Sequence, residues 1–261
     1  MAQLATEDGL TLAYHEWGAE HRGGRPTVVL QHGFVANTRV NWEMPGITGA
    51  LAEAGHHVVG LDARGHGQSA APHDPALYGE RKMAGDLRRL FDLLGGDEVH
   101  LVGYSMGAIV SLITAAEDER VTRLVVGGVG AGVVELGGVD RRALAPERVA
   151  AALFADDPAA IEDDMARAFR QFADALGTDR RALAAQAQAI HMAPIALDAI
   201  GAAALVLAGA DDPLAERPEV LAAAIPGAGV QVVPGDHMSA VAAPELREAL
   251  LAFLAPQPTR G

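Results

Sequence analysis

The stretch GYSMG at residues 103–107 decides how this chain folds. An apolar, strand-like run precedes it at residues 98–102, and an apolar, helix-like run follows at residues 108–116. A G-x-S-x-G between a strand and a helix predicts a sharp turn, which strains the serine backbone and exposes Oγ above the carboxyl edge of a sheet. The two glycines stand where a Cβ would clash as strand and helix close together. The pattern therefore predicts that Ser105 is a catalytic nucleophile.

The rest of the chain alternates between strand-like and helix-like segments. Strand-like runs occupy residues 10–17, 27–31, 57–62, 98–102, 121–127, 203–208 and 229–233. Helical patterns occupy residues 46–54, 78–94, 108–116, 218–224 and 244–254. This alternation predicts a parallel sheet that is covered by helices on both faces. The first run alternates between polar and apolar residues and ends at Gly18, so we expect it to be an antiparallel edge strand.

The alternation breaks off after residue 128. Residues 137–191 are rich in alanine and contain no strand-like run, and Pro146, Pro158 and Gly177 divide them into short helices. We therefore expect an α/β core made of residues 1–136 and 193–261, with a helical cap inserted at residues 137–192. The last residues, 256–261, are expected to form a disordered tail.

Length and composition limit the classes of protein to consider. A chain of 261 residues, half of them apolar, fits one large α/β domain. The net charge of −14 argues against nucleic acid and anionic membranes as partners. The absence of cysteine excludes disulfides, zinc–thiolate sites and a thiol nucleophile. The start resembles no signal peptide and no apolar run could span a bilayer, so we expect a cytoplasmic protein, whose oligomeric state stays open.

A serine nucleophile needs a base to remove its proton and a further group to orient that base. Two later strands end in loops that offer these groups. The run at 203–208 leads into Asp211 and Asp212, and the run at 229–233 leads into His237. Because parallel strands end at the same edge of a sheet, these side chains are expected to meet Ser105. The chain order of serine, acid and histidine is the order known from α/β hydrolases.

Five motifs in order make the chain resemble the α/β-hydrolase superfamily, in its branch of small esterases, C–C hydrolases and cofactor-free haloperoxidases. They are HGF at 32–34, DARGHGQS at 62–69, GYSMG at 103–107, GADD at 209–212 and GDH at 235–237. The resemblance implies a mostly parallel eight-stranded sheet flanked by helices, with a small helical cap inserted after the sixth strand. It also implies that neither a cofactor nor a metal ion is needed.

The resemblance assigns roles to individual residues. Ser105 would be the nucleophile, His237 the base and Asp212 the acid, because the acid usually stands three residues after the glycine that ends the strand. Asp211 stays open as the alternative acid. The backbone amides of Phe34 and Met106 would form the oxyanion hole. The substrate pocket is expected to involve a set of residues from the loops and the cap: Gly33, Val35, Phe169, Phe172, His191 and Met238.

Two further motifs in the loops carry structural expectations. His32 and His66 are expected to organise turns rather than to take part in the chemistry. Asp62 and Arg64 are expected to pair with each other in a turn beside the oxyanion loop and to hold that loop in place. The acidic segment at 162–164 is expected to begin a helix, where negative charge suits the helix dipole.

The leading functional hypothesis is a serine carboxylesterase that acts on small apolar esters through an acyl-enzyme. Alternatives with the same residues are a C–C bond hydrolase, for which Asn37, Arg39 and Asn41 could hold a substrate carboxylate, and a cofactor-free perhydrolase or haloperoxidase. A slow, ligand-binding sensor with a hydrolase fold is a fourth possibility. An epoxide hydrolase or haloalkane dehalogenase would need an aspartate at the position of Ser105, so the serine argues against both.

Overall fold

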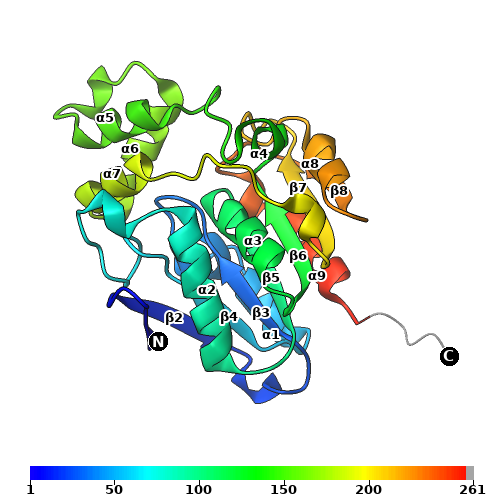
Figure 1. The fold of residues 1–261 in the computed structure, drawn as a ribbon. Helices are drawn as coiled ribbons and strands as arrows, with labels where there is room; N and C mark the ends of the chain where they lie inside the picture. Colours follow the sequence, from blue (N-terminus) through cyan, green and yellow to red (C-terminus); the bar gives the residue numbers. More distant parts are fainter. Residues whose placement is uncertain (257–261) are drawn as a thin grey trace.

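A mostly parallel sheet of eight strands runs through residues 1–256, the part of the chain that the computed structural model describes (Figure 1). The strand order is β1-β2-β4-β3-β5-β6-β7-β8. The strands are β1 (Ala2–Ala5), β2 (Thr11–Trp17), β3 (Thr27–Gln31), β4 (Val58–Leu61), β5 (Val99–Tyr104), β6 (Val121–Gly127), β7 (Ala203–Gly209) and β8 (Gly229–Val233). The predicted fold class is thereby confirmed, while residues 257–261 of the expected disordered tail lie outside the described part.

One prediction about the sheet was wrong. Strand β2 is not at the edge, because β1 pairs with it in antiparallel register, Ala2 opposite Tyr14, and occupies the edge itself. Strand β2 is also antiparallel to β4, whereas β3 to β8 run parallel to one another. The four residues of β1 are mostly exposed or half-buried. Such a short segment has too few apolar positions to show a periodic pattern.

Helices cover both faces of the sheet. They are α1 (Ile47–Glu53), α2 (Glu80–Leu94), α3 (Met106–Glu117), α4 (Ala131–Leu136), α5 (Pro146–Phe154), α6 (Asp164–Leu176), α7 (Arg180–Gln188), α8 (Pro218–Ala224) and α9 (Pro244–Leu254). Side chains of α2, α3 and α8 pack into one apolar cluster, and those of α1 and α9 pack into another on the opposite face. Within residues 1–256, no helix is both long enough and apolar enough to cross a membrane.

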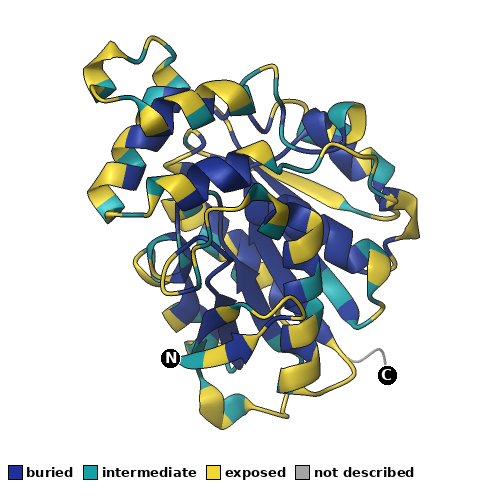
Figure 2. Cartoon of the chain, turned by 60° about the vertical axis from the view of Figure 1, so that its left-hand side comes forward, coloured by how far each residue is buried: buried dark blue, intermediate teal, exposed yellow. Residues whose placement is uncertain are grey.

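The pleat of the central strands explains why both faces are apolar. In β3, Val29 belongs to the cluster with α2 and α3, while its neighbours Val28 and Leu30 belong to the cluster with α1 and α9. Successive side chains of a strand point to opposite faces, so a strand covered on both sides reads as a continuous apolar run. Figure 2 shows these strands buried between helices whose outer faces are exposed. Each fully buried valine or leucine stabilises the fold by about 1.5–3 kcal/mol.

Helices α5, α6 and α7 lie together beyond the carboxyl ends of the strands (Figure 1). They form their own apolar cluster, which includes Leu153, Phe169 and Leu183. Val35 and Leu214, from loops that follow β3 and β7, belong to the same cluster and join it to the sheet. The segment 137–192 is therefore helical and lacks strands, as the sequence indicated. Its division from the rest of the chain as a cap stays a prediction.

The turn between β5 and α3 is as sharp as the sequence predicted. Ser105 has φ 55° and ψ −118°, a strained conformation for a residue with a side chain. A Cβ on Gly103 would overlap the carbonyl oxygen of Gly107. A Cβ on Gly107 would overlap the carbonyl oxygens of Gln31 and His32 at the end of β3. Glycine at these two positions is thus what allows α3 to approach β3 and β5 so closely.

The strand order also explains where a crevice forms. Strand β3 lies between β4 and β5. After β3 the chain continues to β4, toward the β1 edge of the sheet, and after β5 it continues to β6, toward the β8 edge. Neighbouring strands whose connections leave in opposite directions open a crevice at their carboxyl ends, where ligands of α/β proteins bind. Ser105 follows β5, and Gly33 follows β3, at this position.

Substitution of Gly107 tests this close approach. Because the added methyl group in Gly107→Ala would meet two backbone carbonyls that cannot move separately, we expect the free energy of unfolding to fall by about 3 kcal/mol. Equilibrium denaturation in urea measures it. Gly49→Ala is the matched control, since Gly49 lies within α1 with open space around its Cα. That variant should gain up to about 1 kcal/mol from helix propensity. Equal losses in both variants would contradict the proposed packing constraint.

Candidate active site

Ser105, His237 and Asp212 form one line of hydrogen bonds at the carboxyl edge of the sheet. His237 Nε2 lies 2.9 Å from Ser105 Oγ, and His237 Nδ1 lies 2.9 and 3.0 Å from the two carboxylate oxygens of Asp212. Because the carboxylate accepts, the proton of a neutral imidazole stays on Nδ1, which leaves Nε2 free to accept from the serine hydroxyl. All three side chains are buried.

The two loops that carry these groups are tied to the fold. The Tyr104 hydroxyl donates to the carbonyl oxygen of His237 over 2.9 Å, and the backbone amide of Leu214 donates to Asp212 Oδ1, also over 2.9 Å. The neighbouring acid, Asp211, is exposed, and its backbone amide donates to the carbonyl of Gly235. Of the two adjacent acids, the structure therefore brings Asp212 to the histidine.

The backbone amides of Met106, which follows Ser105 in the chain, and of Phe34, on the loop after β3, are free to donate hydrogen bonds. Met106 is the first residue of α3, so its N–H has no acceptor within the helix. Within residues 1–256, the N–H of Phe34 also has no backbone or side-chain acceptor. The positive end of the α3 dipole adds to the attraction for a negative oxygen here. A Cβ on Gly33 would come within 3.3 Å of Ser105 Cβ, so glycine keeps this space narrow but open.

Two buried side chains hold the loop that carries Phe34. His32 Nε2 accepts from the amide of Ala63 over 2.9 Å, and this places the proton on Nδ1, which donates to the carbonyl of Gly33 over 2.8 Å. Burial lowers the pKa of His32 and so favours this neutral form. On the other side, the amide of Gly33 donates to Asn41 Oδ1 over 2.9 Å. The supporting role of Asn41 was missed from the sequence, where it was grouped with possible substrate ligands.

The expected pair between Asp62 and Arg64 does not form. The carboxylate of Asp62 accepts from the backbone amides of Thr38 and Gln68 instead. These backbone amides occupy the Asp62 carboxylate, and the Arg64 guanidinium extends to two other carboxylates, Asp86 and Asp8. Asp62 thus holds the loop after β3 by accepting from the backbone amide of Thr38, while Arg64 joins α2 to the turn between β1 and β2.

Two cavities meet at Ser105. Phe34, Ser105 and Phe169 line both. The first is otherwise lined by Glu80, Met106, Val139, Leu144, Pro146, Val149, Gln186, Ala187, Ile190 and Leu214. The second is otherwise lined by Gly33, Ala36, Val40, Asn41, Pro45, Tyr104, Phe172, His237, Met238, Val241 and Ala242. Both are mostly apolar, as ligand sites commonly are.

The residues expected to form the pocket divide into two groups. Gly33, Phe169, Phe172 and Met238 line one or both cavities. Val35 lines neither, because its backbone, with φ 68°, directs the side chain into the apolar cluster under α5 and α6. His191 also lines neither cavity, and its contribution is a backbone amide that donates to Glu80 Oε2 over 2.6 Å.

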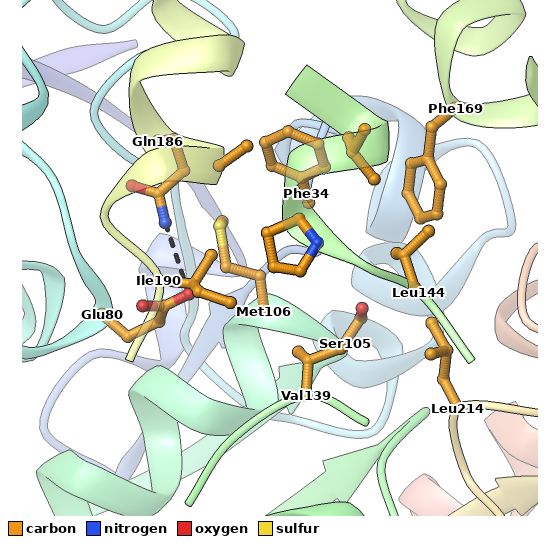
Figure 3. A pocket seen from close by; sticks show the side chains of 13 residues that line it. Phe34, Glu80, Ser105, Met106, Val139, Leu144, Phe169, Gln186, Ile190 and Leu214 are labelled. Carbon is orange, nitrogen blue, oxygen red and sulfur yellow. Dashed lines mark hydrogen bonds between the residues drawn. The ribbon is translucent and has the colours of Figure 1, made fainter. Parts of the chain in front are cut away.

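Glu80 is one of the pocket residues that the sequence did not single out. It begins α2, is almost completely buried, and lies in the first cavity beside Met106 and Ile190 (Figure 3). Besides the amide of His191, the side-chain amide of Gln186 donates to Glu80 Oε1 over 3.3 Å. Within residues 1–256, Glu80 has no ion pair with a basic side chain. Burial therefore dominates and raises the pKa of this carboxyl group to about 7.

Comparison with known proteins shows the family. The family described as "alpha/beta hydrolase fold" matches residues 26–193, well over half of the chain. The chain therefore belongs to the α/β-hydrolase fold family, a class of hydrolases.

Particular relatives are similar over different lengths. A hydrolase from Pseudomonas aeruginosa superposes with a TM-score of 0.78 at 29% identity, over 98% of both chains. The enol-lactonase from Burkholderia xenovorans superposes with a TM-score of 0.74 at 25% identity, over 97% of this chain and 99% of that one. Epoxide hydrolase A of Mycobacterium tuberculosis is 34% identical over 110 residues, which are 41% of this chain and 32% of that protein. The matches span about a third or less of such curated relatives.

The raised pKa of Glu80 makes a prediction about stability. The pKa of this carboxyl group is higher in the folded protein than its ordinary value of 4.5. The folded protein therefore binds the proton more tightly than the unfolded chain does, and ionisation of the group opposes folding. This penalty should grow as the pH rises from about 4.5 to about 7, and reach the order of 3 kcal/mol above that range. Glu80→Gln removes the charge and keeps an oxygen that can accept from His191. Its gain in unfolding free energy should therefore be larger at about pH 8 than at about pH 5.

Urea denaturation at both pH values measures this difference. Glu219→Gln, an exposed change on α8, controls for the loss of one negative charge and should alter stability by less than about 0.5 kcal/mol. A gain in Glu80→Gln that does not depend on pH would contradict the assignment of the penalty to ionisation.

Proposed function

We propose that this protein is a serine esterase that uses Ser105, His237 and Asp212 and forms an acyl-enzyme. The observation that carries the proposal is the unbroken line of hydrogen bonds from Ser105 Oγ through His237 to Asp212, with the serine at the junction of two apolar cavities. A nucleophile, a base that can take its proton, and an acid that orients the base are the groups that acyl transfer requires.

In the first half of the reaction, Ser105 Oγ attacks the ester carbonyl carbon while His237 Nε2 takes its proton. Asp212 then stabilises the imidazolium without becoming protonated itself. The carbonyl oxygen becomes an oxyanion, for which the amides of Phe34 and Met106 are the available donors. A single such donor contributes about 10²–10³ in rate.

Collapse of this intermediate indicates which cavity holds the alcohol and which holds the acyl group. The C–O bond to the alcohol breaks as His237 returns the proton to the leaving oxygen, so the alcohol must lie on the His237 side. That side is the second cavity, which contains His237 and Met238. The acyl group then occupies the first cavity, beside Met106. Water repeats the cycle from the alcohol side and releases the carboxylic acid.

We also propose that residues 137–192 act as a cap over this site. Phe169 of α6 supports this role, because its ring lies 5.9 Å from that of Phe34 and 6.3 Å from that of His237, measured between centroids. A cap residue beside both the oxyanion loop and the base would keep bulk water away from the ester. A drier site strengthens the hydrogen bonds to the oxyanion.

Several curated relatives are named epoxide hydrolases, but the chemistry of a serine argues against that activity here. Attack of Ser105 Oγ on an epoxide carbon would form an ether, which has no carbonyl for water to attack, so the enzyme would stay alkylated. Attack on a carbonyl carbon forms an ester, which water does cleave. The structural neighbour named an enol-lactonase supports the ester reading, because an enol lactone is a cyclic ester.

A C–C hydrolase is less well supported. Asn41 lines the second cavity, where its carboxamide N–H groups can donate to a substrate carboxylate, but Asn37 lines neither cavity. Arg39 is exposed and does not line either cavity. The three residues therefore do not form a common site for a substrate carboxylate.

Hydrolysis of p-nitrophenyl esters of graded acyl length tests the proposal. Wild-type protein should turn over short and medium esters, and Ser105→Ala should lower kcat by a factor of about 10⁴ or more. A fluorophosphonate probe should label the wild type at Ser105 and leave the variant unlabelled. Equal turnover by both proteins would assign the activity to another residue, and labelling without turnover of any ester would favour a slow, ligand-binding sensor.

The two adjacent acids offer a matched comparison. Asp212→Asn should lower kcat by about 10⁴, because an amide no longer holds the proton on His237 Nδ1. Asp211→Asn changes an exposed neighbour with the same chemistry and should stay within a few-fold of wild type, about 0.5 kcal/mol or less. Steady-state kinetics on one p-nitrophenyl ester compares the three proteins. A larger loss in Asp211→Asn would reverse the assignment of the acid.

A further inference from the structure

The first cavity contains one ionisable group that the proposed reaction does not use. Among the residues that line it in the described part of the chain, Glu80 is the one with a carboxyl group, and no basic residue lines it. Figure 3 shows Glu80 and Gln186 at one end of this cavity, with Met106 and Ile190 between Glu80 and Ser105. Apolar side chains thus line the cavity between Ser105 and the carboxyl group of Glu80.

Glu80 has capacity for a hydrogen bond from a ligand. A carboxylate can accept about four hydrogen bonds. The amides of His191 and Glu80 itself and the side chain of Gln186 supply three donors, and the Gln186 contact is long, at 3.3 Å. At least one acceptor position therefore remains for a group that enters the cavity. Within residues 1–256, the protein supplies no basic side chain to fill it.

A purely structural role does not explain why residue 80 is acidic. The tether between α2 and α7 is already made by the backbone amide of Gly79, which donates to Gln186 Oε1 over 3.2 Å. A glutamine at position 80 would accept from His191 equally well and would avoid the burial of a charge. An unpaired buried carboxylate opposes folding, and such groups are concentrated at functional sites.

We propose that Glu80 selects substrates whose acyl group ends in a hydrogen-bond donor, an O–H or N–H group, at the far end of an apolar chain. The inference rests on the proposed ester hydrolysis at Ser105 and adds the class of acyl group. The apolar chain passes Met106 and Ile190, and the terminal donor reaches the free acceptor position of Glu80. Hydroxyacyl and aminoacyl esters are the two substrate types with this chemistry.

The test compares esters that differ in one terminal group. We would measure kcat/KM for p-nitrophenyl esters from butanoate to octanoate, each beside analogues in which a hydroxyl or an ammonium group replaces the terminal methyl. At the best chain length, wild-type protein should prefer at least one polar analogue over the methyl ester by about 10- to 100-fold, the range for a hydrogen bond to a charged group. A hydroxyl or an ammonium preference identifies which donor is recognised.

Two substitutions at position 80 separate charge from hydrogen bonding. Glu80→Leu removes both and should abolish the preference for either polar analogue. Glu80→Gln keeps an acceptor oxygen, so it should retain part of a hydroxyl preference and lose an ammonium preference. Ile190→Val is the matched control, because it alters the size of the same cavity and leaves its polar end unchanged. Any shift in the best chain length should leave the ratio between polar and methyl esters unchanged.

The ratio distinguishes recognition from structural support. Loss of a tether would lower kcat/KM for polar and methyl esters alike and would leave the ratio unchanged. The proposal is overturned if wild type hydrolyses the methyl esters and shows no preference for a polar analogue at any length, or if Glu80→Leu keeps the wild-type ratio. If wild type hydrolyses none of the esters, the proposed function fails instead. Calorimetric binding of the same esters would then measure the preference directly, and equal affinities in wild type and Glu80→Leu would overturn it.

Discussion

The close contact between α3 and the end of β3 is the constraint on which the site depends. Gly107 lies against the carbonyls of Gln31 and His32, and this contact sets the position of the turn that carries Ser105. It brings the free amide of Met106 to the same side as the loop after β3, which carries the amide of Phe34. Ser105 and the two free amides thus come from one backbone packing arrangement. In the proposed reaction, amides that the fold holds in place before substrate binds would act as preorganised donors to the oxyanion.

The sequence predicted the parts of this arrangement that depend on local pattern. Continuous apolar runs located β3 to β7, because strands covered on both faces need no polar alternation. The run at β8 was also located, although that strand lies at the edge of the sheet and is mostly exposed. The sharp turn at Ser105 was also predictable from a local pattern. Glycines at positions 103 and 107 allow a close approach of helix and strand that few other turns require. Asp212 rather than Asp211 followed from spacing within the family pattern, and the structure brings that residue to His237. Strand β1 was missed, because its four residues are too few to show a period.

Side-chain partners were harder to predict than backbone elements. Asp62 and Arg64 looked like a pair because they are close in sequence, yet Asp62 binds backbone amides and Arg64 reaches Asp86 on α2. The direction of a side chain in a turn depends on the dihedral angles of that turn, which the residue types do not specify. Asn41 was misread for a related reason. It lies in a single π-helical turn (Arg39–Glu43), and that turn directs it to the amide of Gly33.

Glu80 shows why the lining of the first cavity could not be predicted from the sequence. In the sequence it is an acidic residue at the start of a helix, a position where negative charge is ordinarily favourable and exposed. Only the packing of α7 and the segment after it against α2 buries the carboxylate, and that packing joins residues more than 100 positions apart. The same burial that raises its pKa removes water as a competing partner for the carboxylate. A hydrogen-bond donor on the proposed substrate would then meet no competition from water at the carboxylate. The interaction would therefore discriminate between substrates more strongly than it could at the surface.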